Sequence, residues 1–523
     1  MTRSDSRKST ATQALGLLSQ GPHPVLFELL YEPHFVDDRE AVLPWLLEID
    51  AAHTVMLART GILAATSAAE LLTVNRELAS ALAAGEPVLG QPPSHRGLYL
   101  VYERHYIDRL GSLVGGAAHV ARSRNDINAA VVRLRLRSGL LDLLDHTLEL
   151  LAAALALGEL HADSLMSGFT HFQPAQPATL GHYLAGICAE LLRSAERLGA
   201  DFDEVNRSPM GAAAGLGTSF PIDRELTASL LGFAEVVDNS VDAVASRDYA
   251  VNVLSALSVL GIALTRLALD LQTWGSHAYG FLAWPDELVS TSSIMPQKRN
   301  AFVLENIRGL AGHPVGALAA MLLALKNTPF SNGVEVGTEA VSHLWPALGG
   351  TETALRLTTL MLRGVEVNVE RMREFLAGAG TTMTALADHL VARHGLAFRT
   401  AHDAIGQLVL RLPRETRESP GAILSALGEI LGELTGREIR LDEAELARVL
   451  DPTHCVQAAV YGGGPAPETV RGQLQRLAQR RERLAERVAA RRRQLSEARA
   501  GLQTEIESIL DAGPWPRERR ETE

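Results

Sequence analysis

The stretch VVRLRLRSGLLDLLDHTLELLAAALALGELHADSL, from Val131 to Leu165, decides the fold class. Its apolar residues recur at the three- and four-residue spacing of a helix, and alanine and leucine dominate it. A helical pattern of this length is typical of a bundle of long helices. The same spacing continues along most of the chain, and alternating β-branched runs are nearly absent. We therefore expect an all-α protein with a long-helix bundle at its core.

Clusters of glycine and proline predict where the helical pattern is divided, because these residues interrupt helices or set turns. The cluster GEPVLGQPPSHRG lies in an N-terminal helical region, which we assign to residues 1–122. The long-helix region follows at 123–363, and a smaller helical region at 364–469 ends near YGGGPAP. A helical tail at 470–523 completes the chain. The expected architecture is a central bundle flanked by smaller N- and C-terminal helical domains.

The tail carries a spaced set of apolar residues that is interrupted by Arg481 and Arg491. This set, which resembles the a and d positions of a heptad, is Val470, Leu474, Leu477, Leu484, Val488, Leu495 and Leu502. Two interpretations stay open for it. One is a solvated, arginine-rich terminal helix, and the other is a helix that docks as a coiled coil.

Composition excludes several classes of function. The 523 residues include 49 Lys and Arg against 61 Asp and Glu, a net charge of −12, which argues against a nucleic-acid-binding protein. With only Cys188 and Cys455, and no apolar signal-like run at the N-terminus, we expect a cytoplasmic protein in a reducing compartment. Polar residues interrupt the apolar window from Val251, which predicts a buried helix and no membrane association. No metal-ligand spacing or nucleotide-binding glycine motif is found, so we expect neither a metal nor a cofactor.

Three polar stretches interrupt the apolar helical pattern, and core packing explains none of them. They are HVARSRNDINAA from His119, SGFTHFQPAQPATLGH from Ser167 and STSSIMPQKRNAFVLENIRG from Ser290. Because glycine, proline and hydroxyl residues disfavour helix interiors, we expect loops that face a shared site.

The third stretch is the most informative. Its four consecutive hydroxyl residues, 290–293, precede Met295-Pro296 and predict a mobile loop. Lys298 follows in a chain whose cations are arginine at 46 of 49 places, which favours a role for a compact ammonium that binds an anion. The alternative is a capped helix start with an incidental lysine.

In the second stretch, His171 follows Thr170 and precedes two prolines. A lone histidine is more often structural than catalytic. A nearby carboxylate would orient it as an acid or base, and Glu305 lies on the helix predicted after the third stretch.

The segment TSSIMPQKRN resembles the signature loop of the aspartase/fumarase superfamily, whose members make or break C–N or C–O bonds by β-elimination with fumarate as product. Within it, SRND at Ser123, GFTHFQPAQP at Gly168 and SPMGAAAGLGTSFPIDRE at Ser208 resemble argininosuccinate lyases. Further collinear similarities extend the resemblance from about Ile49 to Arg471. It implies a homotetramer in which three chains contribute to each active site.

The resemblance also implies roles for individual residues. Ser292 would remove the Cβ proton of the substrate, with its alkoxide favoured by Lys298 and by helix N-termini. His171, oriented by Glu305, would handle the proton of the leaving nitrogen. The residues implied to bind the carboxylates of the dicarboxylate substrate are Ser123, Arg124, Asn125, Thr170, Lys298 and Asn300.

This sequence departs from the family where the family contacts the amine portion of the substrate. Argininosuccinate lyases usually carry a Tyr, a Gln and a Lys after the LKxxP-like segment, where this chain has Asn332, Gly337 and Ala340. The family's Asp-Ile-His element is replaced by residues 97–99, and an early Trp-Gly-Gly opening is missing. We therefore expect a C–N lyase that releases fumarate from an N-substituted aspartate with altered amine specificity. The alternatives are an authentic argininosuccinate lyase and a non-catalytic structural protein on the same fold.

Overall fold

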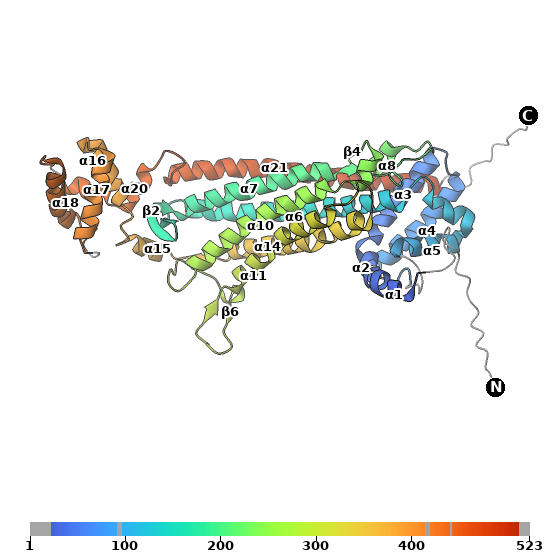
Figure 1. Cartoon of the computed structure of the whole chain (residues 1–523), viewed down its shortest axis with the longest axis horizontal. Coiled ribbons are helices and arrows are strands. Elements are labelled where there is room, and N and C mark those ends of the chain that lie inside the picture. The colour runs from blue at the N-terminus through green and yellow to red at the C-terminus, as the bar shows by residue number, and fades with distance from the viewer. Residues whose placement is uncertain (1–21, 91–96, 414–415, 417–418, 440–441, 512–523) are drawn as a thin grey trace, which may run out of the picture.

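A computed structural model describes residues 22–90, 97–413, 416, 419–439 and 442–511 (Figure 1). The N-terminal segment, in which the sequence predicts no secretory signal, lies outside these residues, as do residues 91–96 of the glycine- and proline-rich break at 85–97.

The central bundle is built around α6 (Arg124–Leu160), a helix of 37 residues. It packs against α7 (Leu180–Val205) and α14 (Leu344–Arg363), and α10 (Asp248–Trp274) packs on α7 and α14. These helices run side by side along the long axis of the molecule (Figure 1). The prediction of an all-α, long-helix bundle is confirmed.

Helix α6 begins where the sequence provides a capping box. Ser123 has an extended backbone, its side chain accepts a hydrogen bond from Asn125 N, and its own N–H donates to Asp126. This reciprocal arrangement satisfies backbone donors that the first turn of a helix leaves unpaired. The polar SRND stretch therefore sets the start of the central bundle helix.

Helix α10 contains the apolar window noted from Val251. Its most apolar window is 61% buried inside the structure, where it packs on α7, α12 (His313–Leu325) and α14, as the prediction of a buried helix requires. By length and composition alone, both α10 and the stretch Phe302–Leu325 are apolar enough to cross a membrane. The second stretch is only 22% buried in one chain, and so leaves an apolar face uncovered.

Two smaller helical units lie at opposite ends of the bundle (Figure 1). At one end α3 (Leu43–Arg59), α4 (Ala65–Ala83) and α5 (Leu98–Gly115) share a core with the start of α6. At the other end lies a separate core, made by α16 (Met383–His394), α17 (Phe398–Arg411), α18 (Pro420–Thr435) and α19 (Glu443–Val449).

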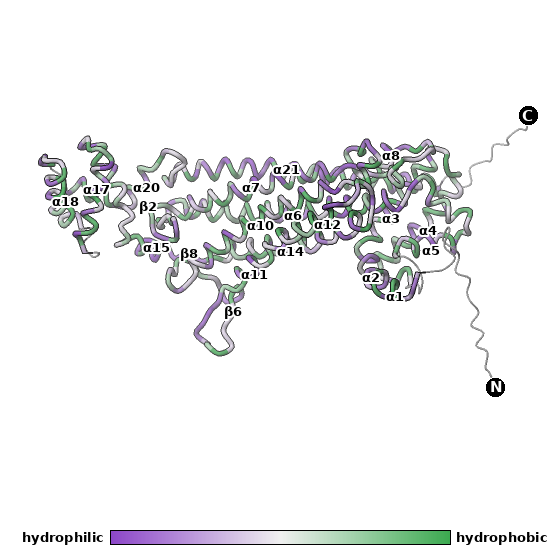
Figure 2. Tube along the Cα trace, viewed as in Figure 1, coloured by the Kyte–Doolittle hydropathy of each residue, from purple (hydrophilic) through white to green (hydrophobic). Residues whose placement is uncertain are grey.

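The tail forms α21 (Pro467–Asp511), which lies along α6 and α7 and reaches α3, α4 and α8 (Arg224–Leu230). Of the two interpretations of this tail, the docked helix is the one that forms. Six of the seven heptad residues are buried, and Leu495 packs against the core as a partly buried residue. Polar residues nonetheless recur along the helix (Figure 2).

The two arginines that interrupt the repeat reach backbone oxygens of the bundle. Arg481 donates to Leu148 O at 2.8 Å, and Arg491 donates to Gly199 O at 2.7 Å. A long arginine side chain can pack its methylenes and still deliver its charge to a polar acceptor, so these residues fit the docked face.

The remaining elements are short connections. The helices are α1 (Pro24–Leu26), η1 (Phe27–Tyr31), α2 (Glu32–Ala41), η2 (Gly116–His119), α9 (Ser240–Ala245), η3 (Asp286–Leu288), α11 (Phe302–Leu310), η4 (Glu335–Glu339), α13 (Ala340–Ser342), α15 (Val369–Leu376) and α20 (Pro452–Ala458). The strands form two-stranded pairs: antiparallel β1 (Leu165–Thr170) with β2 (Gln173–Thr179), parallel β3 (Arg207–Ser208) with β4 (Glu235–Val236), antiparallel β5 (Leu282–Ala283) with β8 (Glu366–Val367), and antiparallel β6 (Ser290–Thr291) with β7 (Arg299–Asn300).

Docking of α21 predicts the effect of truncating its buried face. Leu484 is 1% exposed and lies against Gly199, so Leu484→Ala should leave a cavity and lower the free energy of unfolding by about 2–5 kcal/mol. Gln475→Ala, at an exposed position of the same helix, should change it by less than about 0.5 kcal/mol. Urea unfolding of both variants at one protein concentration measures the difference. Equal midpoints would contradict the docked packing.

Candidate active site

The signature stretch forms a loop that projects from the bundle between β6 and β7 (Figure 1). Ser290 pairs with Asn300 and Thr291 pairs with Arg299, which closes the base of the loop. Arg299 also donates to Trp284 O at 2.8 Å and forms an ion pair with Asp286. The ends of the loop are thereby tied to the bundle, while most residues between them are exposed.

Within this loop, Ser292 is held by backbone donors. Its Oγ accepts hydrogen bonds from Ile294 N at 3.3 Å and Met295 N at 3.1 Å. Donors that point at a hydroxyl oxygen favour negative charge on it, since they stabilise the alkoxide more than the alcohol. Lys298 lies in the same loop, in a turn that is closed by a hydrogen bond from Lys298 N to Met295 O at 3.0 Å. Sequence reasoning named Lys298 and helix N-termini as the sources of positive potential and missed these two amides.

His171 lies at the tip of the β1–β2 hairpin. Thr170 pairs with Gln173, so His171 and Phe172 form a two-residue turn, and both have positive φ values of 52° and 59°. This is the backbone of a type I′ hairpin, which non-glycine residues adopt at some cost. Both side chains are exposed, and the hairpin is anchored behind them by Phe169, which packs on Trp274. The hairpin therefore presents His171 outward.

The expected pairing of Glu305 with His171 is not formed within one chain. Glu305 lies on α11, which packs on α10 and α14, and its Oε1 accepts a hydrogen bond from Gln272 of α10 at 3.0 Å. Its carboxylate is held against the bundle surface, whereas the hairpin turns His171 away.

The SRND residues lie at the other end of the bundle. Asn125 Nδ2 donates to Ala214 O at 3.2 Å, and its Oδ1 accepts from Asn332 Nδ2 at 2.8 Å. Asn332 is one of the positions at which this chain departs from the family, so the altered segment touches the SRND element directly. Arg124 is exposed and forms no ion pair within the described part of the chain.

Helix length separates the predicted site residues. Ser123 precedes α6 and Thr170 follows it, and 37 helical residues at 1.5 Å each span about 55 Å. The loop of Ser292 lies closer to the hairpin end but projects away from the bundle (Figure 1). One chain therefore does not bring the three polar stretches together, which is compatible with the implied sharing of each site between chains.

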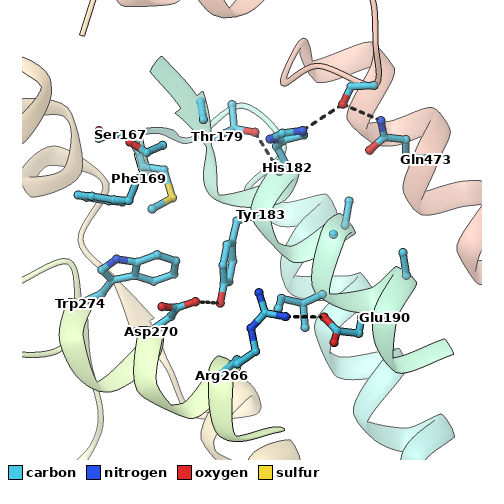
Figure 3. Close-up of a pocket in the computed structure, with 18 of the residues that line it drawn as sticks. Ser167, Phe169, Thr179, His182, Tyr183, Glu190, Arg266, Asp270, Trp274 and Gln473 are labelled. Carbon is cyan, nitrogen blue, oxygen red and sulfur yellow. Dashed lines mark hydrogen bonds and ion pairs between the residues drawn. The ribbon is translucent and has the colours of Figure 1, made fainter. Parts of the chain in front are cut away.

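A cavity of about 790 Å³ lies behind the hairpin, between α7, α10 and α21 (Figure 3). Tyr183 donates to Asp270 at 2.7 Å, and Arg266 faces Glu190 at 3.5 Å. Ser167 and Phe169 line this cavity, but none of the predicted catalytic or substrate-binding residues does. Arg480, which also lines the cavity, pairs with Glu196 at 2.8 Å.

A second pocket, of about 720 Å³, runs along the first turns of α6. Arg124 lines it, together with Gly337 and with residues 97–99, which replace the family's Asp-Ile-His element. The pocket thus joins one predicted carboxylate-binding residue to two of the segments that differ from the family. The sequence alone did not indicate that these segments meet.

Comparisons with known proteins assign the chain to a family. A family model described as lyase matches residues 100–316, and one described as argininosuccinate lyase C-terminal matches residues 380–457. Argininosuccinate lyase 1 of Shouchella clausii is 34% identical over 465 residues, which cover 89% of this chain and 93% of the relative. Argininosuccinate lyase of Methanothermobacter thermautotrophicus is 38% identical over 427 residues, 81% of this chain and 90% of the relative.

The chain belongs to the argininosuccinate lyase family of the aspartase/fumarase superfamily. It is a carbon–nitrogen lyase. A crystal structure of EDDS lyase in complex with formate superposes with a TM-score of 0.83 at 30% identity, over 94% of this chain and 97% of that chain. The 3-carboxy-cis,cis-muconate lactonizing enzyme of Pseudomonas putida, at 22% identity and a TM-score of 0.66 over 88% of this chain and 100% of that chain, shares the fold.

Sequence reasoning missed a buried carboxylate of this lyase. Asp126 is fully buried and accepts hydrogen bonds from Ser123 N, Gly211 N and Ala213 N. Burial raises its pKa to about 6, against the opposing effect of these donors. The carboxylate ties the SRND turn to the glycine-rich loop after β3. The capping-box spacing of Ser123 and Asp126 was the signal that could have found it.

A buried polar cluster supports the same turn from α3. Arg122 forms an ion pair with Asp50, and both are almost fully buried. His53 Nε2 donates to Val120 O at 2.8 Å. Burial, helped by the charge of Arg122, lowers the pKa of His53 to about 3, so the imidazole stays neutral. No group of three or more His, Cys, Asp or Glu in the described part of the chain is arranged to hold a metal ion.

The lowered pKa of His53 predicts acid sensitivity of folding. Below about pH 6.5 the unfolded chain gains a proton on this histidine that the folded chain does not, so stability falls as pH falls, by about 1.4 kcal/mol per pH unit. His53→Gln can still donate to Val120 O and should remove this contribution. Relative to wild type, it should gain about 2 kcal/mol between pH 6.5 and pH 5 in urea unfolding. His402→Gln, at an exposed histidine, is the control for loss of one ionisable group. Parallel pH profiles of wild type and His53→Gln would contradict a neutral buried His53.

Proposed function

We propose that this lyase eliminates an amine from an N-substituted aspartate, with release of fumarate, and that its amine specificity differs from that of argininosuccinate lyases. The observation that carries the proposed reaction is the geometry of Ser292, whose oxygen receives two backbone N–H groups in an exposed loop beside Lys298. A serine in this setting can act as the base for a weakly acidic C–H bond.

In the proposed reaction, the Ser292 alkoxide removes the Cβ proton and leaves a carbanion delocalised into the adjacent carboxylate. Lys298 and Asn300 stabilise the resulting dianion. The electron pair then forms the Cα–Cβ double bond of fumarate while the C–N bond breaks, and the nitrogen takes a proton delivered through His171. Ser123, Arg124, Asn125 and Thr170 complete the binding of the two carboxylates.

We also propose that the active enzyme is a homotetramer whose sites combine loops from different chains. The distance of about 55 Å spanned by α6 keeps Ser123 and His171 apart in one chain. Exposed apolar residues on two bundle helices, which include Ile262 of α10 and Leu323 of α12, form a surface that a second copy would cover. Glu305 would then meet His171 across a chain boundary. The two free cysteines support our assignment of the enzyme to the cytoplasm.

Altered amine specificity is supported by the pocket along α6. Gly337 stands in its wall where the family usually has Gln, and Asn332 is engaged by Asn125. Ala340, where the family has Lys, is fully buried and offers no polar group. Without the family's Tyr, Gln and Lys, the site loses polar contacts to the amine portion, and contacts of this kind are the largest source of selectivity.

An authentic argininosuccinate lyase is the second candidate, and one observation favours it. The curated relatives named above carry that name and align over 81–89% of this chain. Its substrate would be argininosuccinate, with arginine and fumarate as products, in arginine biosynthesis. Fumarate release from argininosuccinate at an efficiency like that of other family members would favour this candidate over altered specificity.

The proposed base is tested by Ser292→Ala. Loss of general-base catalysis should lower fumarate release, followed by ultraviolet absorbance, by roughly 10²–10⁴-fold across a panel of N-substituted aspartates. Ser293→Ala is the matched control, because it removes a neighbouring exposed hydroxyl from the same loop. Similar losses in both variants, or none in Ser292→Ala, would reject the assignment of the base.

Sharing of sites between chains is tested by mixing two inactive variants. Ser292→Ala and His171→Asn should each be inactive alone, because each lacks one essential group in every site. After they are unfolded and refolded together, random assembly should place both intact groups in roughly a quarter of the sites. Each variant refolded by itself is the control. No recovery of activity, with tetramers formed, would show that one chain supplies both residues.

A further inference from the structure

The pocket along α6 extends well beyond Arg124. Asn128, Val131 and Arg135 line it in succession, at the spacing of residues that share one face of a helix. Arg124 and Arg135 are eleven residues apart, which corresponds to a rise of about 16 Å. The pocket therefore has a guanidinium at each end, and its volume of about 720 Å³ suits a small organic ligand.

Arg135 is held in place by an aromatic ring rather than by a carboxylate. Its guanidinium carbon lies 3.8 Å from the centroid of the Trp345 ring, which also lines the pocket. A stacked guanidinium keeps its N–H edge directed outward in its plane, where it can bind a carboxylate bidentately. Within the described part of the chain, no carboxylate forms an ion pair with Arg135.

The charge of Arg135 persists despite partial burial. Burial lowers its pKa, and the negative charge of Asp38, another residue of the pocket wall, opposes that change. An anion placed at the edge of the guanidinium would add a stronger, directed interaction.

Between the two arginines the wall is mixed, with the carboxylates of Asp38 and Glu40 beside apolar side chains. Leu98, Val131 and Val132 are all less than 10% exposed and contribute to the lining. These buried apolar side chains offer a surface on which the hydrocarbon part of a ligand can pack.

From this arrangement we propose that the amine portion of the substrate ends in a carboxylate, which Arg135 binds, and that an apolar spacer joins this carboxylate to the reacting nitrogen. This inference rests on the proposed function, since Arg124 is taken to hold the aspartate end. Arg135 is then a specificity-determining residue of the lyase.

The test compares matched substrate pairs. N-(ω-carboxyalkyl)aspartates with about three to seven methylenes, a range set by the 16 Å rise between the arginines, are assayed beside N-alkylaspartates of equal length. Wild type should favour the carboxylate member of the best pair by about 10–100-fold in kcat/KM, as expected for one charge-assisted bidentate contact. Arg135→Gln should reduce that ratio to less than about threefold. Arg399→Gln, at an exposed arginine of α17, should leave the ratio as in wild type.

The ratio distinguishes loss of recognition from loss of structure, because a damaged enzyme loses activity towards both members of a pair. A wild-type ratio near one, or a ratio that survives in Arg135→Gln, would overturn the inference. Titration calorimetry measures the binding of the same N-(ω-carboxyalkyl)aspartates without requiring catalysis. It therefore tests the inference about Arg135 separately from the proposed function. Binding that weakens at least tenfold in Arg135→Gln without any fumarate release would refute the proposed reaction and support the pocket. If the compounds are not bound and no fumarate is released, both the inference about the pocket and the proposed reaction are refuted.

Discussion

The fixed rise of the α-helix is the constraint on which the rest of this molecule depends. Each residue advances the axis by 1.5 Å, so the 37 residues of α6 place the SRND turn and the His171 hairpin about 55 Å apart. Because α7, α10, α14 and α21 pack along it, the whole bundle inherits this length. A chain built in this way carries polar groups at both of its ends and on a projecting loop, and does not gather them within one copy.

Each polar stretch is nevertheless organised locally before any assembly. The capping box of Ser123 and Asp126 orients the SRND turn, and the buried His53 and Arg122 support it from α3. Two residues with positive φ expose His171, and two amides converge on Ser292. Local order of this kind lowers the cost of arranging groups that must meet a substrate with accurate geometry. Assembly would bring together preformed parts.

Specificity has a different physical origin from the proposed chemistry. The residues expected to handle the fumarate portion lie in turns whose backbone holds them. In the proposed function, the amine portion faces a wall made by α6, η4 and the start of α5, where side chains can change without disturbing the bundle. Gly337 and Gly97, where the family usually has polar residues, leave space in this wall, and Arg135 stacked on Trp345 adds a charge to it. The same scaffold can thereby serve a different amine.

The amino-acid sequence by itself determined the helical bundle, because a hydrophobic period near 3.6 over more than thirty residues has few other solutions. It also identified the signature loop, since its hydroxyls, proline and single lysine suit no helix interior. The sequence left the packing of the tail undecided, because a heptad pattern predicts which face of a helix is buried but not what it packs against. In the structure that face packs on the bundle, and Arg481 and Arg491 donate hydrogen bonds to bundle backbone oxygens. The sequence suggested that Glu305 orients His171, whereas within one chain Glu305 accepts a hydrogen bond from Gln272. Only the tertiary structure brought Asn332 to Asn125, and Arg135 into one pocket with Gly337, because contacts across some two hundred residues depend on how helices pack rather than on local spacing.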